Sequence, residues 1–144
     1  MKPVSAHDVA KYILKKVGGM TTMKLQKLLY YCQAWSLVWD DTPLFKEEIE
    51  AWANGPIVPE IYQSHKGLFN VDSWKKGSIE KLNKTQKETI DKVLDFYNKK
   101  TAQWLSELTH KESPWKDARK GLFPGQRGSA KISHASMVEY YSGL

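Results

Sequence analysis

The stretch of sequence that decides the fold is KLQKLLYYCQAW, residues 24–35. Apolar residues recur in it three and four positions apart, which is the spacing of one helix face. That face consists of Leu25, Leu28, Leu29, Cys32, Trp35 and Trp39. Because aromatic and aliphatic residues also fill much of the remaining circumference, the pattern predicts a helix buried among others, over about residues 22–39. Its few polar residues lie mainly in the first half, and we expect that end to reach solvent or a partner; they are Lys24, Gln26, Lys27 and Gln33.

Signals for further helices lie on both sides of this segment. Ser5, with Asp8 three residues later, favours a capped first helix. The other expected starts are Thr21 or Thr22 for the central helix, then Pro59, Thr85 in a capping box with Glu88, Thr101, Ser113 before Pro114, and Ser133. Residues 44–58 fit either a short helix or a short β-ribbon, and residues 67–84 read as a loop. We therefore expect a mainly α fold, a compact single-domain bundle of about six or seven helices, over residues 1–144.

The charge of the chain is unevenly distributed. Its formal net charge is +6, and residues 75–144 hold all of the excess, with twelve Lys, two Arg and eight acidic residues. A basic half is typical of proteins that meet nucleic acid or an acidic partner. Arg, however, is the residue that recognises base edges and phosphates, so the Lys excess fits solvated helix faces better. Nucleic-acid binding is an alternative function, and it would use Lys111, Lys116, Arg119, Lys120, Arg127 and Lys131.

Patterns of catalysis and of cofactor binding are missing from the sequence. It contains no glycine-rich phosphate loop, no HExxH, no CxxC and no GxSxG, and Cys32 is its one cysteine. We therefore expect no enzyme, no cofactor and no metal; the alternative is an enzyme whose site is assembled in space around His110 and Glu112. The first residues lack the apolar core of a signal peptide, and no stretch approaches a membrane span. We expect a cytoplasmic protein without membrane contact.

Three segments combine residue types that neither a core nor a solvated surface explains by itself. They are residues 24–35, then AWANGPIVPEIY at 51–62, and LTHKESPW at 108–115. Exposed aromatic residues beside Lys are typical of protein interfaces, and the expected partner contacts are Lys24, Lys27, Tyr31, Trp52, Asn54 and His110. Other residues are expected to hold the fold, namely Leu25, Leu28, Gly55, Pro56, Pro114 and Trp115. The competing interpretation of every segment is structural, since buried aromatic residues stabilise a small domain strongly.

In this order, the three segments resemble the Panacea antitoxin domain, also called the SocA-like or GepA-like family. The family's KLQKLLYY helix resembles residues 24–31, its AW-x-x-GP segment resembles residues 51–56, and its TH-x-x-x-PW segment resembles residues 109–115. The resemblance extends over about residues 5–142, which is nearly the whole chain.

The resemblance implies an antitoxin, from a toxin–antitoxin pair or from a phage or mobile element, that neutralises a protein toxin by direct binding. The toxin would be encoded by an adjacent gene. One type of member also acts as an adaptor that delivers its toxin to a protease, so that role is implied as well. Some members carry an added DNA-binding module, for which this chain shows no separate segment. Under the enzyme alternative, the chain would be an uncharacterised phage-associated enzyme.

Overall fold

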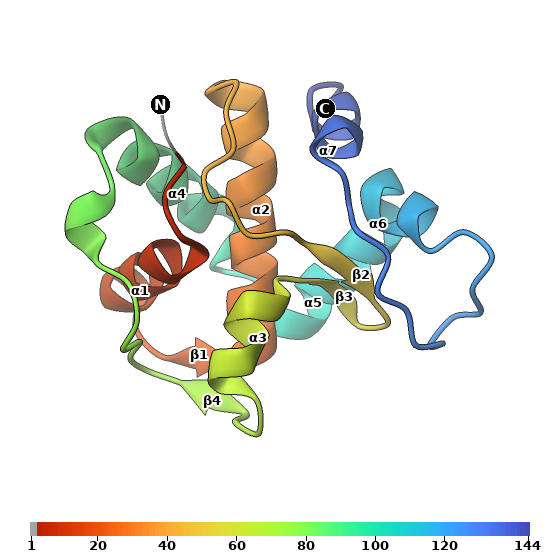
Figure 1. The fold of residues 1–144 in the computed structure, drawn as a ribbon, viewed down its shortest axis with the longest axis horizontal. Coiled ribbons are helices and arrows are strands. Elements are labelled where there is room, and N and C mark those ends of the chain that lie inside the picture. The colour runs from red at the N-terminus through yellow and green to blue at the C-terminus, as the bar shows by residue number, and fades with distance from the viewer. Residues whose placement is uncertain (1–2) are drawn as a thin grey trace.

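The computed structural model describes residues 3–144, so the first two residues of the expected domain lie outside it. Within this range the chain is mainly α-helical, as the sequence predicts, with two small antiparallel sheets and one 3₁₀ helix (Figure 1). The α-helices are α1 (Ala6–Val17), α2 (Thr22–Trp39), α3 (Pro59–His65), α4 (Lys84–Tyr97), α5 (Ala102–Lys111), α6 (Ser113–Ala118) and α7 (His134–Tyr141). Among these described helices, none combines the length and the apolarity that a membrane span requires.

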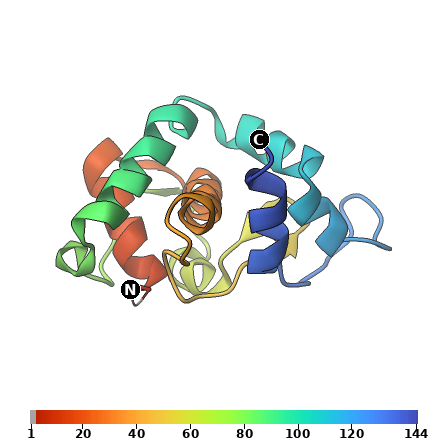
Figure 2. The same ribbon diagram turned by 90° about the horizontal axis from the view of Figure 1, so that it is seen from above.

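Helix α2 lies at the centre, and Figure 2 shows it nearly end-on with other elements around it. It packs against α1, α4, α5, α7 and strand β3 (Gly55–Ile57). Leu25 and Leu28 have no exposed surface, which confirms the apolar spacing as a core signal. Cys32 is also fully buried, and burial raises the pKa of its thiol, so it is a core residue rather than a nucleophile.

The predicted helix starts are mostly confirmed. Ser5 forms the expected capping box with Asp8, while Thr21, Thr101 and Ser133 accept backbone N–H bonds at the starts of α2, α5 and α7. Two starts are wrong. Helix α4 is capped by Asn83, in a box with Gln86, two residues before Thr85. Helix α6 has Glu112 at its N-cap, and Ser113 is already helical.

The polar residues of α2 mostly do not reach solvent, contrary to the sequence-based expectation. Gln33 is buried, and its amide accepts from the backbone N–H of Leu44 at 2.8 Å and donates to the carbonyl of Phe45 at 2.9 Å. Gln26 is buried as well and accepts from the backbone N–H of Val58 at 2.8 Å. Extended backbone that packs on a helix needs such partners, because its N–H and C=O groups have no ladder of their own. These two side chains therefore hold both ends of the 44–58 segment against α2.

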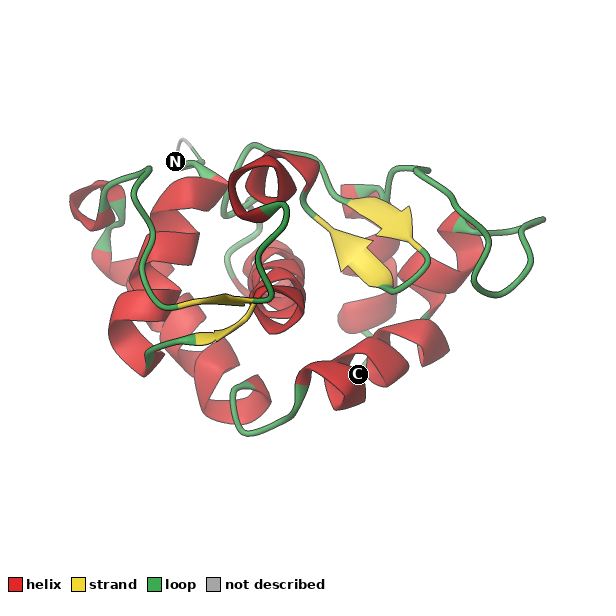
Figure 3. Ribbon diagram, turned by 90° about the horizontal axis from the view of Figure 1, so that it is seen from below, coloured by secondary structure: helices red, strands yellow, loops and turns green. Residues whose placement is uncertain are grey.

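The 44–58 segment contains a β-hairpin, so the β-ribbon is the correct alternative and the short helix is not. Strand β2 (Glu50–Trp52) pairs antiparallel with β3, with Trp52 opposite Gly55, as the strands in Figure 3 show. The expectation of a plain loop over residues 67–84 is incomplete. Strand β4 (Asn70–Val71) pairs with β1 (Met20–Thr21) there, and a 3₁₀ helix covers Ile79–Lys81.

Candidate functional site

The three sequence segments meet at the amine of Lys27. Gly55 of the hairpin lies directly against it with φ +127°, a backbone angle that side chains rarely adopt. A Cβ atom at position 55 would collide with Lys27 Cε and would lie 3.2 Å from both Lys27 Nζ and Thr109 Oγ1. The first segment thus supplies Lys27, and the second supplies Gly55, which leaves room for the lysine side chain. The third segment supplies Thr109, which lies next to both.

Lys27 itself was expected to contact a partner at the surface, and the structure corrects this. It is only 1 % exposed, and its Nζ has no hydrogen-bond partner within residues 3–144. Burial lowers the pKa of this amine to about 7, because the charged form loses its hydration without gaining a carboxylate. The physical reason for the correction is tertiary, since the hairpin and α5 cover a helix face that would otherwise be solvated.

His110 lies near enough to Lys27 to feel its charge, and one of its two ring nitrogens also lacks a partner within residues 3–144. Its ring stacks on Trp115 with the centroids 4.0 Å apart and the planes at 12°. Its Nε2 atom is buried without a hydrogen bond among the described residues. Burial lowers the pKa of His110, and the nearby charge of Lys27 lowers it further, so the imidazole is held neutral. Two adjacent buried nitrogens are therefore unsatisfied behind the hairpin.

Tyr31 and Lys24 also depart from the expected surface role. Tyr31 is fully buried, stacks on Tyr97, and donates its hydroxyl to Glu112 Oε1 at 2.7 Å. Lys24 is half-buried, and its Nζ donates to the carbonyl of Asn98 at 2.6 Å, which joins α2 to the end of α4. The contacts of Tyr31 and Lys24 therefore agree with the competing interpretation, in which these side chains stabilise the fold.

Glu112 and His110 are held by different partners. Its Oε1 accepts from the hydroxyls of Tyr31 and Tyr141, both at 2.7 Å. Burial raises the pKa of this carboxyl, and the two hydroxyl donors oppose the rise. His110, by contrast, faces Lys27 and Asn54, and no hydrogen bond joins the two side chains in residues 3–144. Within residues 3–144, no group of three or more His, Cys, Asp or Glu side chains is placed to hold a metal ion.

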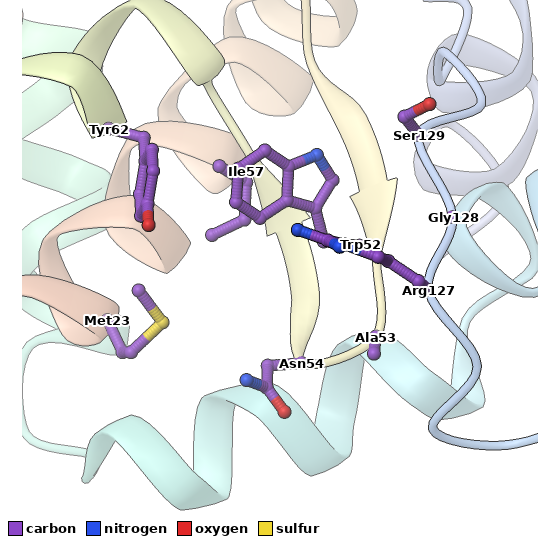
Figure 4. Close-up of a pocket in the computed structure, with 9 residues that line it drawn as sticks. All are labelled: Met23, Trp52, Ala53, Asn54, Ile57, Tyr62, Arg127, Gly128 and Ser129. Atoms are coloured by element: carbon purple, nitrogen blue, oxygen red, sulfur yellow. The ribbon is translucent and has the colours of Figure 1, made fainter. Parts of the chain in front are cut away.

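Trp52 and Asn54 line an open hollow of about 560 Å³, whose lining side chains Figure 4 shows. Trp52 is half-buried and meets Tyr62 edge to face, with ring centroids 5.0 Å apart. Asn54 is exposed at the hairpin tip. Arg127 is exposed on the far wall and makes no hydrogen bond or ion pair within the described residues. The complete lining is Met23, Trp52, Ala53, Asn54, Ile57, Tyr62, Arg127, Gly128 and Ser129, hereafter the Trp52 hollow.

The third segment fixes the hairpin that carries Trp52. Trp115 donates its indole N–H to the carbonyl of Trp52 at 2.8 Å, and Ser106 donates to the carbonyl of Asn54 at 2.5 Å. Pro114, Pro56 and Gly55 are buried, as expected of structural residues. The hollow therefore has a firmly held aromatic wall, because the backbone carbonyls of Trp52 and Asn54 are bonded to α6 and α5, respectively.

The contacts of Arg119 and Lys131 weaken the nucleic-acid alternative. Arg119 is only 5 % exposed; its guanidinium donates to the carbonyl of Ala51 at 3.0 Å and to that of Gln126. Lys131 is paired with Glu48 at 2.7 Å. Two of the six expected phosphate contacts are thus committed within the fold, and one of them is inaccessible.

Of the residues that line the Trp52 hollow, the sequence predicted only Trp52 and Asn54 as protein contacts; Met23 and Tyr62 were missed, and Arg127 was named only for the nucleic-acid alternative. Tyr62 closes the second segment, so its proximity to Trp52 could have been inferred from the β-ribbon and the helix that follows. Arg127 carries no such signal, because it lies in a Gly- and Pro-containing loop whose path depends on tertiary contacts.

Comparison with known families gives one finding that spans this site. The family model described as Antitoxin SocA-like, Panacea domain, matches residues 25–116, which is more than half of the chain. The matched range contains α2 from Leu25 onward, the hairpin and the Thr109–Trp115 segment. Comparisons with curated proteins and with solved structures give no match.

Proposed function

This chain belongs to the antitoxin SocA-like, Panacea-domain family, and from that premise we propose that it neutralises a protein toxin by direct binding at the Trp52 hollow. In this proposal the chain acts by occupying a surface of the toxin rather than by catalysis. The toxin would be the product of an adjacent gene.

The observation that carries the proposal is an open hollow that joins apolar surface to unused polar groups. Trp52 and Tyr62 offer aromatic surface, and Asn54 and Arg127 offer amide and guanidinium groups that face solvent. Trp, Tyr and Arg are the residue types that dominate the energetics of protein interfaces. A hollow of this kind suits a protruding side chain of a partner, with the exposed polar groups at its margin.

Arg127 gives the proposal an electrostatic direction. Its guanidinium has no partner of its own in the described structure, and the half of the chain around it carries the entire net charge of +6. A toxin surface with carboxylates beside an apolar anchor would be complementary to it. Lys27 and His110 lie behind the hairpin and support the wall, so they are not contacts in this proposal.

The first test is co-expression of the chain with each adjacent reading frame, scoring growth and co-purification together. We expect one neighbour to be toxic alone, to be tolerated with the chain, and to co-purify with it. Rescue with a falling level of the toxin would instead indicate delivery to a protease. A stable complex in which the toxin remains fully active would contradict neutralisation by binding.

The second test uses variants of the hollow in the same assay. Arg127→Glu should weaken the complex about tenfold or more, because it places a carboxylate against the expected acidic surface. Phe69→Ser is the matched control: Phe69 is 76 % exposed and does not line the hollow. Equal rescue by wild type and Arg127→Glu, with equal complex stability, would exclude this surface.

A further inference from the structure

A second open site is lined by side chains from α2, α4, α5 and α7, the four helices whose arrangement Figure 2 shows. It is a groove of about 460 Å³ with mainly aromatic walls. Three of its large side chains are unusually open to solvent: Trp39 is 45 % exposed, Phe96 56 % and Trp104 40 %. Large aromatic residues that gather on an exposed surface mark interaction sites more often than single exposed ones do. We call this site the Trp39 groove.

The floor of the Trp39 groove holds a buried carboxylate with one free oxygen. Glu112 is only 4 % exposed, yet it lines the groove. Its Oε1 accepts both tyrosine hydroxyls, whereas Oε2 has no hydrogen bond within residues 3–144. Oε2 is also not among the fully buried atoms that lack a partner, which are Lys27 Nζ and His110 Nε2. It therefore keeps some contact with solvent, and the Trp39 groove is the open site that Glu112 lines.

No cation of the described chain neutralises this carboxylate. The ion pairs found there are His7–Glu60, Lys16–Asp91 and Lys131–Glu48, and none includes Glu112. A buried carboxylate with two hydroxyl donors but no positive partner has charge left to offer a ligand.

The rings of the groove already attract ammonium groups. Lys92 Nζ lies 5.5 Å from the ring centroid of Trp39, and Lys100 Nζ lies 4.6 Å from that of Trp104. Aromatic faces attract cations through the ring quadrupole, so these rings favour ammonium and guanidinium groups over anions. Aromatic walls and an unpaired carboxylate thus favour the same class of ligand.

We propose that the Trp39 groove binds a basic side chain, Lys or Arg, of a protein partner, with the cation directed at Glu112 Oε2. The apolar neighbours of that side chain would lie over Trp39, Phe96 and Trp104. A protein segment suits the groove because these rings are spread along an open surface, where a lone small cation would leave most of them uncovered. This site is separate from the Trp52 hollow and does not depend on the proposed function.

Lys92 and Lys100, which lie over the exposed rings, provide a test of whether the ligand is positively or negatively charged. They repel an incoming cation, so Lys92→Gln should tighten binding of a basic segment. If the natural ligand were acidic, the same variant would weaken binding. Lys92 is exposed and makes no side-chain hydrogen bond or ion pair within residues 3–144, and its amine lies over the Trp39 ring, so its replacement should leave the fold intact.

The experiment titrates the whole chain with capped tripeptides and follows the indole N–H signals by NMR. The probes are acetyl-Leu-Arg-Leu-amide and the same peptide with citrulline, which is a neutral isostere of arginine, or with glutamate at the centre. We expect the arginine peptide to shift the signals of Trp39 and Trp104 but not of Trp52. It should bind about tenfold more tightly than the citrulline peptide, the difference between a charge-assisted and a neutral contact.

Variants complete the test. Glu112→Gln keeps an oxygen acceptor for the two tyrosine hydroxyls and should abolish the preference for arginine over citrulline. If that variant does not fold, Trp39→Ala and Lys92→Gln decide the question, since they should weaken and tighten arginine binding, respectively. Equal affinity for arginine and citrulline, or tighter binding of the glutamate peptide, would overturn the proposal. Guanidinium ion alone binding as tightly as the arginine peptide would overturn the assignment to a protein segment.

Discussion

Two buried ionisable side chains near α2, Lys27 and Glu112, differ in their hydrogen bonds. Lys27 is enclosed by the hairpin and α5, and its amine has no partner within the described residues. Glu112 is nearly as buried, but two tyrosine hydroxyls bond it and the Trp39 groove leaves one of its oxygens open. Burial is the largest influence on both groups and favours the neutral form of each: it lowers the pKa of Lys27 and raises the pKa of Glu112.

Lys27 is thus held by tight packing without a hydrogen bond in the described structure, whereas Glu112 is held by hydrogen bonds. Lys27 fits only because position 55 has no side chain, so the amine and the glycine depend on each other. The Glu112 network depends on hydroxyl donors that can be removed singly without a collision. Substitutions at Lys27 and Gly55 should therefore cover a wider range of stability changes, losses as well as gains, than the removal of a hydroxyl donor of Glu112.

The largest effect is expected for Gly55→Ala. The added Cβ meets Lys27 Cε in a space that is fully enclosed, and the backbone angle is itself unfavourable, so we expect a loss of about 3 kcal/mol or more. Urea unfolding would measure it. Gly18→Ala is the control: Gly18 also has a positive φ but meets nothing within 4 Å, so only the backbone strain of about 1–3 kcal/mol remains and the loss should be smaller than for Gly55→Ala.

A double variant sharpens this prediction. In a Lys27→Ala background, Gly55→Ala should lose only as much stability as Gly18→Ala does, because the colliding atom is gone. If Gly55→Ala is equally destabilising with and without the lysine side chain, the two residues are not coupled as described.

Tyr31→Phe should have the next largest effect. It removes one of the two hydroxyl donors of Glu112 without opening a cavity, and hydrogen bonds to charged groups contribute about 2 kcal/mol. The pKa of Glu112 should rise further in this variant, since a donor to its charged form is lost. Tyr62→Phe is the control, because the Tyr62 hydroxyl has no hydrogen-bond partner in residues 3–144. Equal stability of both variants would contradict the proposed network.

Lys27→Met should stabilise the fold, by about 1–2 kcal/mol at pH 7, since it replaces a buried unpaired amine by an apolar chain of similar length. The pH dependence gives a second readout. The pKa of Lys27 falls to about 7 in the folded chain, so above that pH the unfolded chain binds a proton that the folded chain does not. Stability should therefore rise with pH between about 7 and 9, with a slope approaching about 1.4 kcal/mol per unit.

Below pH 7 this contribution becomes flat, and the folded chain bears the full effect of the buried charge. His65 and His110, the other titratable groups near the amine, both have lowered pKa values and are neutral in the window above pH 7. The Met variant should lack the slope. Wild type and Lys27→Met with parallel pH profiles would show that the amine is solvated.

Arg127→Glu should change stability least, by less than about 0.5 kcal/mol, because the guanidinium is exposed and unpaired in the described structure. Thermal unfolding would measure it beside the binding assay. A large loss of stability would mean that Arg127 supports the fold, and its effect on a toxin complex could then not be assigned to contact.

The local signals of the sequence predicted most of the fold. Ser5, Thr101 and Ser133 cap their helices through residues no more than three positions away, so a pattern within one turn suffices. The start of α4 was missed because two capping boxes overlap, and the sequence does not rank Asn83–Gln86 against Thr85–Glu88. The central helix was found because its spacing of Leu residues recurs over many turns.

The candidate site was predicted less well, for a tertiary reason. Lys27 looks like a surface residue until the hairpin covers it, and charged residues are rarely buried without a partner. Trp39 was assigned to the buried face, although its ring is 45 % exposed. Trp104 shows the same problem: it lies four residues before Leu108, which is the spacing of a buried helix face, yet it is 40 % exposed.

The most direct test of the central claim is a titration of the purified toxin with the purified chain, following toxin activity. Wild type and Trp39→Ala should both abolish activity at equal molar ratio, whereas Arg127→Glu should require about tenfold more protein. This result would place neutralisation at the Trp52 hollow and leave the Trp39 groove for another partner. Full inhibition by Arg127→Glu at equal molar ratio, with loss of inhibition in Trp39→Ala, would contradict the account and move the toxin to the groove.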